Sequence, residues 1–240
     1  PPRPSKLEAA AGIIEFVDVS FSYPETDRAV LEGIKFVAQA GETVAIVGPT
    51  GSGKSTLLAL LARLYDPTEG KILLDGIPLT ELDPGNLRTR IGFVPQEAFL
   101  FSDSIAGNIG LGLAPLADTS REREKVISSA AAIAQLHEQV LAFTDQYDTI
   151  LGERGINLSG GQKQRATLAR ALARDPLILV LDDALSGVDT QTEAAILKDL
   201  RSSMKACTSF IISHRISAVM DADQILVLEE GRIVERGKHA

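Results

Sequence analysis

Residues 48–56 read GPTGSGKST, and this segment restricts the possible folds more than any other in the chain. It fits the pattern G-x-x-x-x-G-K-[ST], follows the apolar run TVAIV and precedes the helical pattern KSTLLALLARLY. Those flanks are the context in which the pattern forms a loop between a buried strand and a helix. Glycine-rich backbone in such a loop turns tightly and points its N–H groups inward, so that they surround anionic oxygens. The sequence therefore predicts a phosphate-binding cradle.

Single positions of the cradle have separate predicted roles. Lys54 places a full positive charge against the terminal phosphates, and Ser55 offers a hydroxyl to Mg²⁺, which prefers hard oxygen ligands. A chance glycine-rich turn is the alternative interpretation, and the strand and helix on either side argue against it. The predicted nucleotide contacts in this segment are Gly48, Pro49, Thr50, Gly51, Ser52, Gly53, Lys54, Ser55 and Thr56.

A second apolar run, ILVLD at 178–182, ends in Asp182 and is followed at once by Asp183. Ligands of open α/β sheets bind at the carboxyl ends of the strands, so Asp182 is expected beside the cradle. Its carboxylate is predicted to bind Mg²⁺ through water. An ordinary aspartate in the turn after a strand is the alternative.

The order of the predicted elements indicates an α/β fold. Strands and helices alternate and several strands are apolar on both faces, which favours a mostly parallel sheet covered by helices. We expect strands at 13–23, 33–41, 42–48, 90–96, 178–182 and 208–213, hairpins at 71–79 and 224–236, and helices at 54–65, 120–143 and 162–174.

Three of these expectations are specific. Alternation in the first strand puts Val17, Val19, Phe21 and Tyr23 on one face. Asp75 and Gly76 are the expected turn of the first hairpin. The helix at 120–143 is expected to begin with Thr119 or Ser120 as its cap, and the helix at 54–65 to stop at the following Asp-Pro pair.

Composition limits the partners. The net charge of −8 and pI near 5.0 argue against a nucleic-acid partner, because a protein that grips a phosphate backbone carries a basic face. The single cysteine, Cys207, cannot form an internal disulfide, which fits a reducing cytosol. Residues 1–12 contain three prolines and are expected to form a linker.

The segment LSGGQ at 158–162 lies between the cradle and the strand that ends in aspartate. With it, the chain resembles the nucleotide-binding domain of ATP-binding cassette (ABC) transporters from Ile13 to His239. Every motif of that family occurs in order: an aromatic residue, the cradle, a glutamine, this signature, the acidic strand, SGVD at 186–189 and a histidine.

The resemblance implies a fold and domain boundaries. The fold is a P-loop NTPase (RecA-like) core with a mostly parallel sheet, an N-terminal antiparallel β subdomain and an inserted α-helical subdomain. After the linker, the domain is expected to fill 13–240. Residues 13–97 and 163–240 would form the β subdomain and the core, and 98–162 the helical subdomain that ends in the signature.

The resemblance also implies a head-to-tail dimer with two ATP molecules between its subunits. Tyr23 would stack on adenine, Gln96 would contact both Mg²⁺ and the attacking water, and His214 would hydrogen-bond the γ-phosphate. The structural alternatives are a core tyrosine, a solvated turn glutamine and a structural histidine. The residues expected to meet the ATP of the opposite subunit or line the dimer seam are Ser159, Gly160, Gly161, Gln162 and Asp189.

Two further segments are similar to those of exporters with domain-swapped membrane helices. They are AFLFSDSIAGNI at 98–109 and TILGERG at 149–155. This similarity implies a transmembrane-domain partner contacted through coupling helices, and a position on the cytoplasmic face of a membrane. The chain would then be the ATPase end of a longer polypeptide whose membrane half precedes Pro1.

Asp183 departs from the family, in which glutamate usually orients the attacking water. The two residue types have similar unperturbed pKa values, so the difference is one of reach. Loss of one methylene withdraws the carboxylate by on the order of 1 Å, and misplacement of that size can slow a reaction about 10²-fold. The site would be slow, as in the degenerate half of a heterodimeric exporter, which we favour over a homodimer. The alternative is that Asp183 works as an ordinary base after a small backbone shift.

Three functions remain open at this point. The first is the energy-coupling ATPase of an exporter. The second is an ATP-holding regulatory half that rarely hydrolyses. The third is a soluble ABC protein acting on DNA or in translation, which the acidic charge and the exporter-like segments oppose.

Overall fold

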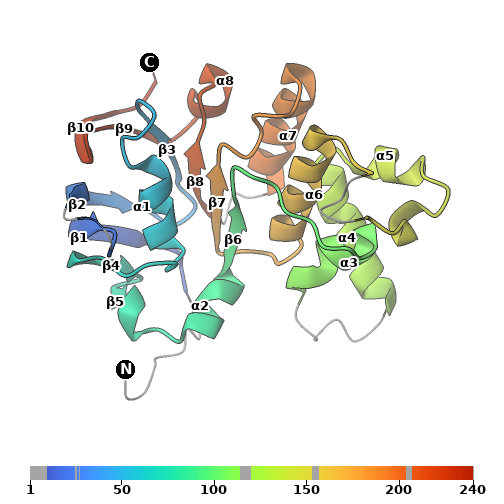
Figure 1. The fold of residues 1–240 in the computed structure, drawn as a ribbon, viewed down its shortest axis with the longest axis horizontal. Helices are drawn as coiled ribbons and strands as arrows, with labels where there is room; N and C mark the ends of the chain where they lie inside the picture. Colours follow the sequence, from blue (N-terminus) through green and yellow to red (C-terminus); the bar gives the residue numbers. More distant parts are fainter. Residues whose placement is uncertain are drawn as a thin grey trace. The chain divides into compact units, whose positions relative to one another are not determined.

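The computed structural model describes residues 10–24, 26, 28–113, 120–152, 157–203 and 207–239 (Figure 1). The chain divides into two compact units, which are described separately. Unit 1 comprises 1–91, 177–182 and 206–240, and unit 2 comprises 92–176 and 183–205. The linker and the subdomain boundaries expected from the sequence stay predictions.

Unit 1 contains a four-stranded antiparallel sheet of order β2-β1-β4-β5. Its strands are β1 (Ile14–Ser22), β2 (Ala29–Ala38), β4 (Glu69–Leu74) and β5 (Ile77–Pro78). β4 and β5 form the predicted hairpin, with Asp75 and Gly76 at φ 50° and 80°. Positive φ at both central residues gives a turn whose twist matches that of the strands.

The predicted face of β1 is wrong in one respect. Val19 and Phe21 are buried as expected, but Phe16 is fully buried and Val17 only partly so. Asp18 adopts a φ of 47°, and the pairing with β2 shifts register between Phe16 and Val19. This bulge inserts one residue and reverses the alternation, so the inward residues before it are the even-numbered ones.

The second sheet has the order β10-β9-β3-β8-β7-β6. Its strands are β3 (Thr43–Val47), β6 (Ile91–Val94), β7 (Ile178–Asp182), β8 (Thr208–Ile212), β9 (Gln224–Glu229) and β10 (Arg232–Gly237). β3 pairs in parallel with both β8 and β9, and β7 in parallel with β8, whereas β10 returns antiparallel to β9. All five residues of β7 are buried, as covered parallel strands require. The predicted α/β fold class is confirmed.

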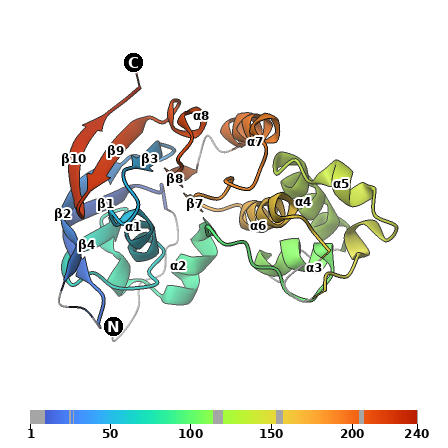
Figure 2. The same ribbon diagram turned by 45° about the horizontal axis from the view of Figure 1, so that its top comes forward.

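Helix α1 (Lys54–Leu61) contacts strands of both sheets (Figure 2). It ends four residues before the predicted end, because Arg63 adopts a left-handed φ of 50°. The N–H groups of Arg63 and Leu64 bond to the carbonyls of Leu60 and Ala59, which closes the helix with a Schellman motif. The remaining helices of unit 1 are η1 (Leu79–Glu81), α2 (Pro84–Arg90) and α8 (Ile216–Val219).

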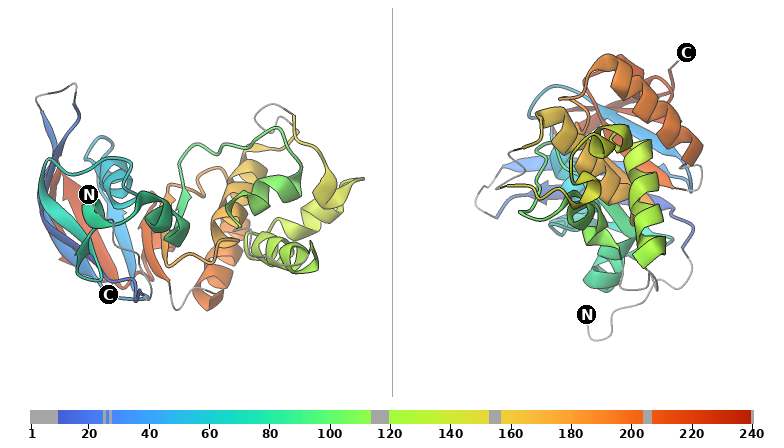
Figure 3. Two further views of the ribbon diagram at one scale, coloured as in Figure 1. Left: turned by 90° about the horizontal axis from the view of Figure 1, so that it is seen from below. Right: turned by 90° about the vertical axis from the view of Figure 1, so that its right-hand side faces the viewer.

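Unit 2 is helical. Its helices are α3 (Ile105–Ile109), η2 (Gly110–Gly112), α4 (Ser120–Ile133), α5 (His137–Leu141), η3 (Gln146–Asp148), α6 (Gly160–Leu172) and α7 (Thr190–Ser203). α6 packs against α3 and α4 (Figure 3). No helix of the described ranges combines the length and the apolar content needed to cross a membrane.

The single helix predicted at 120–143 is two helices. Gln135 has a left-handed φ of 53°, and the Leu136 N–H bonds back to the Ala131 carbonyl. This second Schellman motif ends α4, and α5 starts after it in a new direction. Of the two predicted caps, Thr119 lies outside the described residues and Ser120 is the first residue of α4.

The core of unit 1 depends on three phenylalanines. Phe16 and Phe36 stack with ring centroids 4.6 Å apart, and the centroid of Phe210 lies 6.4 Å from that of Phe36. Phe36 belongs to the antiparallel sheet and Phe210 to the parallel one, and both are at most 2% exposed. Phe36 therefore joins the two sheets.

We expect Phe36→Ala to lower the free energy of unfolding by about 3–5 kcal/mol, because it leaves a cavity between the sheets. Urea titration of the chain, followed by circular dichroism, measures the loss. Phe99→Ala is the control, since Phe99 is 49% exposed, and we expect a loss of about 1 kcal/mol or less. Equal losses in the two variants would contradict the assigned core.

Candidate functional site

The cradle at 48–56 joins β3 to α1, as the sequence predicts. Gly48 and Gly53 have φ values of 149° and 102°. A Cβ on Gly48 would lie 2.0 Å from the backbone oxygen of Leu228, and one on Gly53 2.7 Å from a methyl of Leu31. Only glycine allows the loop to pass this close to its neighbours.

Lys54 lies folded within the cradle. It is 8% exposed, and its Nζ donates to the carbonyl oxygens of Gly48 at 2.9 Å and Pro49 at 2.7 Å. Ser52 is also buried, and its Oγ has no hydrogen-bond partner within the part of the chain that the structure describes. A loop that holds a buried ammonium group and an unsatisfied hydroxyl fits an anion with several acceptor oxygens.

Asp182 comes to the mouth of the cradle. The hydroxyl of Ser55 donates to Asp182 Oδ1 at 3.1 Å, although the two residues are 127 positions apart. No group of three or more His, Cys, Asp or Glu residues capable of holding a metal occurs in the described ranges. Two hard oxygen donors suit Mg²⁺, which usually takes one or two protein ligands and completes its shell with phosphate oxygens and water.

Tyr23 follows β1 and lies half-buried beside α1. Its hydroxyl is 3.1 Å from Thr56 Oγ1, so it is tied to the end of the cradle. Its ring meets Phe21 and Tyr65 edge-on, with centroids 4.9 and 5.3 Å away. Sequence analysis missed Tyr65, which is 42% exposed and lies just after α1. The aromatic cluster offers an open ring surface next to the cradle.

His214 follows β8, which lies between β3 and β7 in the sheet. Parallel strands end at the same edge, so His214 leaves the sheet between the strand before the cradle and the strand that ends in Asp182. Its side chain is exposed. Unit 1 thus brings together Tyr23, the cradle, Asp182 and His214.

The signature lies in unit 2, at the start of α6. Ser159 Oγ accepts from the Gln162 N–H at 3.2 Å, and the Ser159 N–H donates to Gln162 Oε1 at 2.8 Å. This capping box fixes the first turn of the helix while the Ser159 side chain stays exposed. A Cβ on Gly160 would meet nothing within 4 Å, so the helix end is open at this point.

The SGVD loop packs directly on the signature helix. Gln164 of α6 accepts from the Gly187 N–H at 2.8 Å and donates to Ser186 Oγ at 3.2 Å. A Cβ on Gly161 would lie 2.8 Å from the Gly187 oxygen. Sequence analysis missed Gln164, because nothing local to it indicates a partner 22 residues away.

Asp189 ends this loop and directly precedes α7. Its Oδ1 accepts from the Thr192 N–H at 2.9 Å. Hydrogen bonds from the backbone and side chain of Thr192 hold the pKa of the Asp189 carboxyl below its usual value. The loop that ends at Asp189 is thus hydrogen-bonded through Ser186 and Gly187 to the signature helix, within unit 2.

Asp183 and Gln96 are the remaining predicted residues, and both belong to unit 2. Asp183 is half-buried, with a left-handed φ of 46°, and its carbonyl accepts from the Ser186 N–H at 3.2 Å. Aspartate tolerates this conformation better than most residues. Gln96 is exposed in the irregular segment after β6.

The two exporter-like segments lie side by side in unit 2. Ser104 and Ile150 form an isolated bridge, and the Leu151 N–H donates to the Asp103 carbonyl at 3.0 Å. Residues 153–156 of the second segment lie outside the described residues. Three exposed apolar side chains belong to these segments: Phe99, Phe101 and Ile150.

We expect Ser159→Ala to lower the free energy of unfolding by about 1 kcal/mol, because the capping box loses its serine acceptor. Thermal unfolding of the chain measures this loss. Ser128→Ala, within α4, is the control and should be neutral or slightly stabilising, since alanine favours a helix interior. A larger loss at Ser128 than at Ser159 would contradict the capping role.

Three comparisons with known proteins agree. Residues 31–186 match the family described as ABC transporter. The chain is 49% identical over 232 residues to an uncharacterized ABC transporter ATP-binding protein of Bacillus subtilis, covering 96% of this chain and 39% of that protein. It is 45% identical over 243 residues to an ATP-dependent lipid A-core flippase of Alkalilimnicola ehrlichii, covering 100% of this chain and 40% of the flippase.

A solved structure is similar over the whole chain. A bacterial Atm1-family ABC exporter with ATP bound superimposes with a TM-score of 0.91 at 41% identity, covering 100% of this chain and 41% of the exporter. The chain thus spans about two fifths of the length of the relatives it matches. It belongs to the ABC transporter family.

Proposed function

We propose that this chain binds Mg-ATP in its cradle and hydrolyses it to drive an exporter, as one of two such domains at the cytoplasmic face of a membrane. The observation that carries the proposal is the 3.1 Å hydrogen bond between Ser55 Oγ and Asp182 Oδ1. It brings the two groups expected to hold Mg²⁺ to the mouth of a phosphate cradle.

Different residues of unit 1 would bind different parts of Mg-ATP. Lys54 would exchange the carbonyls of Gly48 and Pro49 for β- and γ-phosphate oxygens, which are stronger, charged acceptors. Ser55 and Asp182 would hold Mg²⁺, which neutralises phosphate charge when it is bound. Tyr23 would receive the adenine on its ring and His214 would donate to the γ-phosphate.

The signature supports a dimer. Ser159 and Gly160 are exposed at the N-terminus of α6, a helix of 13 residues whose first turn is fixed by the capping box. Free N–H groups and the helix dipole at such an end favour a phosphate. We infer that a second ABC domain supplies this phosphate and that Asp189 lines the seam between them.

The exposed apolar side chains of Phe99, Phe101 and Ile150 support a membrane-domain partner, and the rings of Phe99 and Phe101 contact each other. These side chains are 49%, 47% and 64% exposed, and they belong to the two segments that resemble exporters. Large apolar side chains grouped on a surface indicate an interface. The similar proteins include an ATP-dependent lipid A-core flippase and an ABC exporter, which favours the same partner.

Asp183 supports a second candidate, an ATP-holding half of a heterodimer. Its shorter side chain would leave the attacking water poorly oriented while the cradle still binds ATP. The backbone at Asp183 has a left-handed φ of 46°, a conformation that aspartate adopts at a lower energetic cost than glutamate. The alternative of an ordinary working base predicts a rate that glutamate would not improve.

A soluble ABC protein acting on nucleic acid is less well supported. The net charge of −8 disfavours a phosphate-backbone partner, and the similar proteins named above are transporters.

Lys54→Ala should weaken ATP binding by at least about 10²-fold and abolish hydrolysis, because the only ammonium group of the cradle is lost. Equilibrium binding of a fluorescent ATP analogue measures the affinity, and phosphate release measures the rate. Lys71→Ala, at an exposed position of β4, is the control. Unchanged binding in the Lys54 variant would place the nucleotide elsewhere.

Asp183→Glu should raise the turnover number by about 10-fold or more with little change in ATP affinity, since the longer side chain restores reach. The measurement is made on homodimers of this chain, in which both signatures are intact. A defective signature in a different partner therefore cannot mask an increase in the turnover number. Phosphate release at saturating Mg-ATP is the measurement. A turnover number that stays the same or falls would support the working-base alternative.

A further inference from the structure

One side-chain oxygen of α5 connects that helix to the signature. Gln139 Oε1 accepts from Gln162 Nε2 at 3.1 Å and from Arg165 Nη2 at 2.9 Å. Gln162 uses its own Oε1 to hold the Ser159 N–H. Gln139 therefore fixes the amide that completes the capping box.

Arg165 also holds the first turn of α6, through the Gly161 carbonyl. Its Nε donates to the Gly161 carbonyl at 3.2 Å, and its Nη1 donates to the Gln135 carbonyl. The side chain is 7% exposed. Burial lowers the pKa of the guanidinium, and the negative charge of Asp189 opposes that shift. The position of the Gly161 backbone thus depends on Arg165 as well as on the helix.

The network continues to α7. Gln135, the left-handed residue that ends α4, donates from Nε2 to Asp199 Oδ2 at 2.7 Å. One connected path of hydrogen bonds runs from α7 through the α4–α5 turn to the signature. It exists because the helix expected at 120–143 breaks at this residue.

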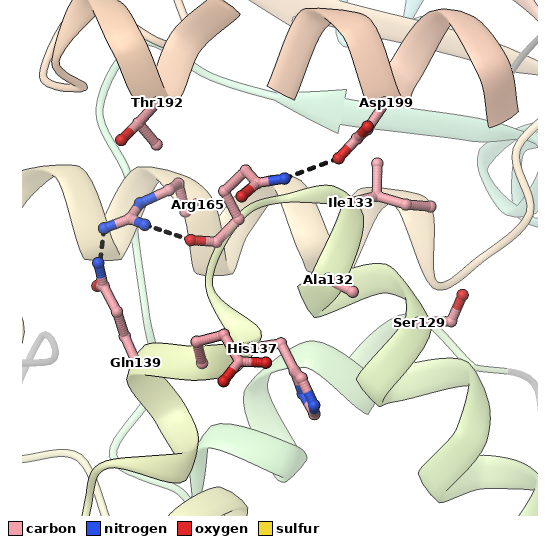
Figure 4. Close-up of a pocket in the computed structure, with 10 residues that line it drawn as sticks. Ser129, Ala132, Ile133, His137, Gln139, Arg165, Thr192 and Asp199 are labelled. Carbon is pink, nitrogen blue, oxygen red and sulfur yellow. Dashed lines mark hydrogen bonds between the residues drawn. The ribbon is translucent and has the colours of Figure 1, made fainter. Parts of the chain in front are cut away.

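These side chains border a cavity rather than a packed core. Gln135, Gln139, Arg165 and Asp199 line a cavity of about 600 Å³ in unit 2, and Figure 4 shows Arg165 and Gln139 pointing toward each other and joined by a hydrogen bond. Close packing resists movement of a side chain, whereas a side chain beside open space is held by its hydrogen bonds. Loss of the Gln139 acceptor would therefore remove one hydrogen bond from Gln162 and one from Arg165, and would loosen the first turn of α6 that these two side chains hold.

We propose that Gln139 and Arg165 are positioning residues, which set the orientation of Ser159 and Gly161 toward the γ-phosphate bound by the second ABC domain. This inference rests on the proposed function. Both residues act through the signature and do not touch the nucleotide. Because small misplacements of binding groups have large effects on rate, their loss should lower turnover rather than the affinity of one chain for ATP.

The test compares Gln139→Met, which keeps the length of the side chain and removes the acceptor, with Gln139→Glu, whose carboxylate can accept from both partners. In the complete transporter that contains this chain, we expect Gln139→Met to lower the turnover number roughly 5- to 50-fold. Gln139→Glu should stay within about 2-fold of the unchanged protein, because a charge-assisted acceptor replaces the neutral one. ATP affinity of the single chain should change less than about 2-fold in both variants, since the cradle is untouched.

Gln146→Met is the matched control. Gln146 is exposed in η3 of the same unit, and turnover should be unchanged. Circular dichroism checks that each variant folds. Gln139→Ala is a second variant that lacks the acceptor, and alanine favours the helical conformation of α5.

Several outcomes would overturn the inference. Turnover within 2-fold in the acceptor-free variants, an equal loss in Gln139→Glu, or a fall in single-chain ATP affinity that matches the loss of turnover would each show a role other than positioning. Lys54→Ala separates this failure from failure of the proposed function. If Lys54→Ala abolishes hydrolysis and Gln139→Met leaves the turnover number unchanged, only the positioning role of Gln139 and Arg165 is contradicted. If hydrolysis survives Lys54→Ala, the proposed function fails.

Discussion

Parallel pairing of β3, β8 and β7 is the constraint on which the rest of unit 1 depends. The register joins Val44 to Phe210 and Val180 to the same residue, so three strands far apart in sequence end at one edge. The cradle follows β3, His214 follows β8, and Asp182 is the last residue of β7. Shifting one strand by a residue would reverse its faces and move its functional side chain. The full burial of β7 resists such a shift.

Close approach of backbone to backbone adds a second constraint. The cradle passes Leu228 so closely at Gly48 that no other residue fits without movement. Two kinds of residue in the sequence therefore define the site. Polar residues provide the groups expected to bind phosphate, and glycines allow the loop to pass close to neighbouring backbone. Lys54, buried among carbonyls, shows how such a loop stabilises a charge that would otherwise be costly to bury.

Much of this could be predicted because its signals are local. The cradle, the acidic strand and the Asp75–Gly76 turn each carry a pattern within a few residues. The bulge at Asp18 and the helix ends at Arg63 and Gln135 could not be predicted, since each needs a left-handed residue that is not glycine. Tertiary contacts set these conformations, as they set the bonds of Gln164 and Gln139 to partners more than 20 residues away.

The left-handed backbone has consequences for chemistry as well as for packing. At Gln135 it ends a helix and frees a carbonyl for Arg165, and at Asp183 it favours the shorter acid at the position where we propose that side-chain reach controls the rate of hydrolysis. In our proposal, the backbone preference for aspartate and the longer reach that hydrolysis requires act against each other at this one residue.

The most direct measurement is the position of the γ-phosphate in a cryo-EM structure of the complete transporter with Mg²⁺ and a non-hydrolysable ATP analogue. Our account predicts that Lys54 Nζ of one ABC domain and the signature serine of the other both lie within hydrogen-bonding distance of that phosphate. Nucleotide bound away from Lys54, or a closed phosphate site built from a single domain, would contradict it.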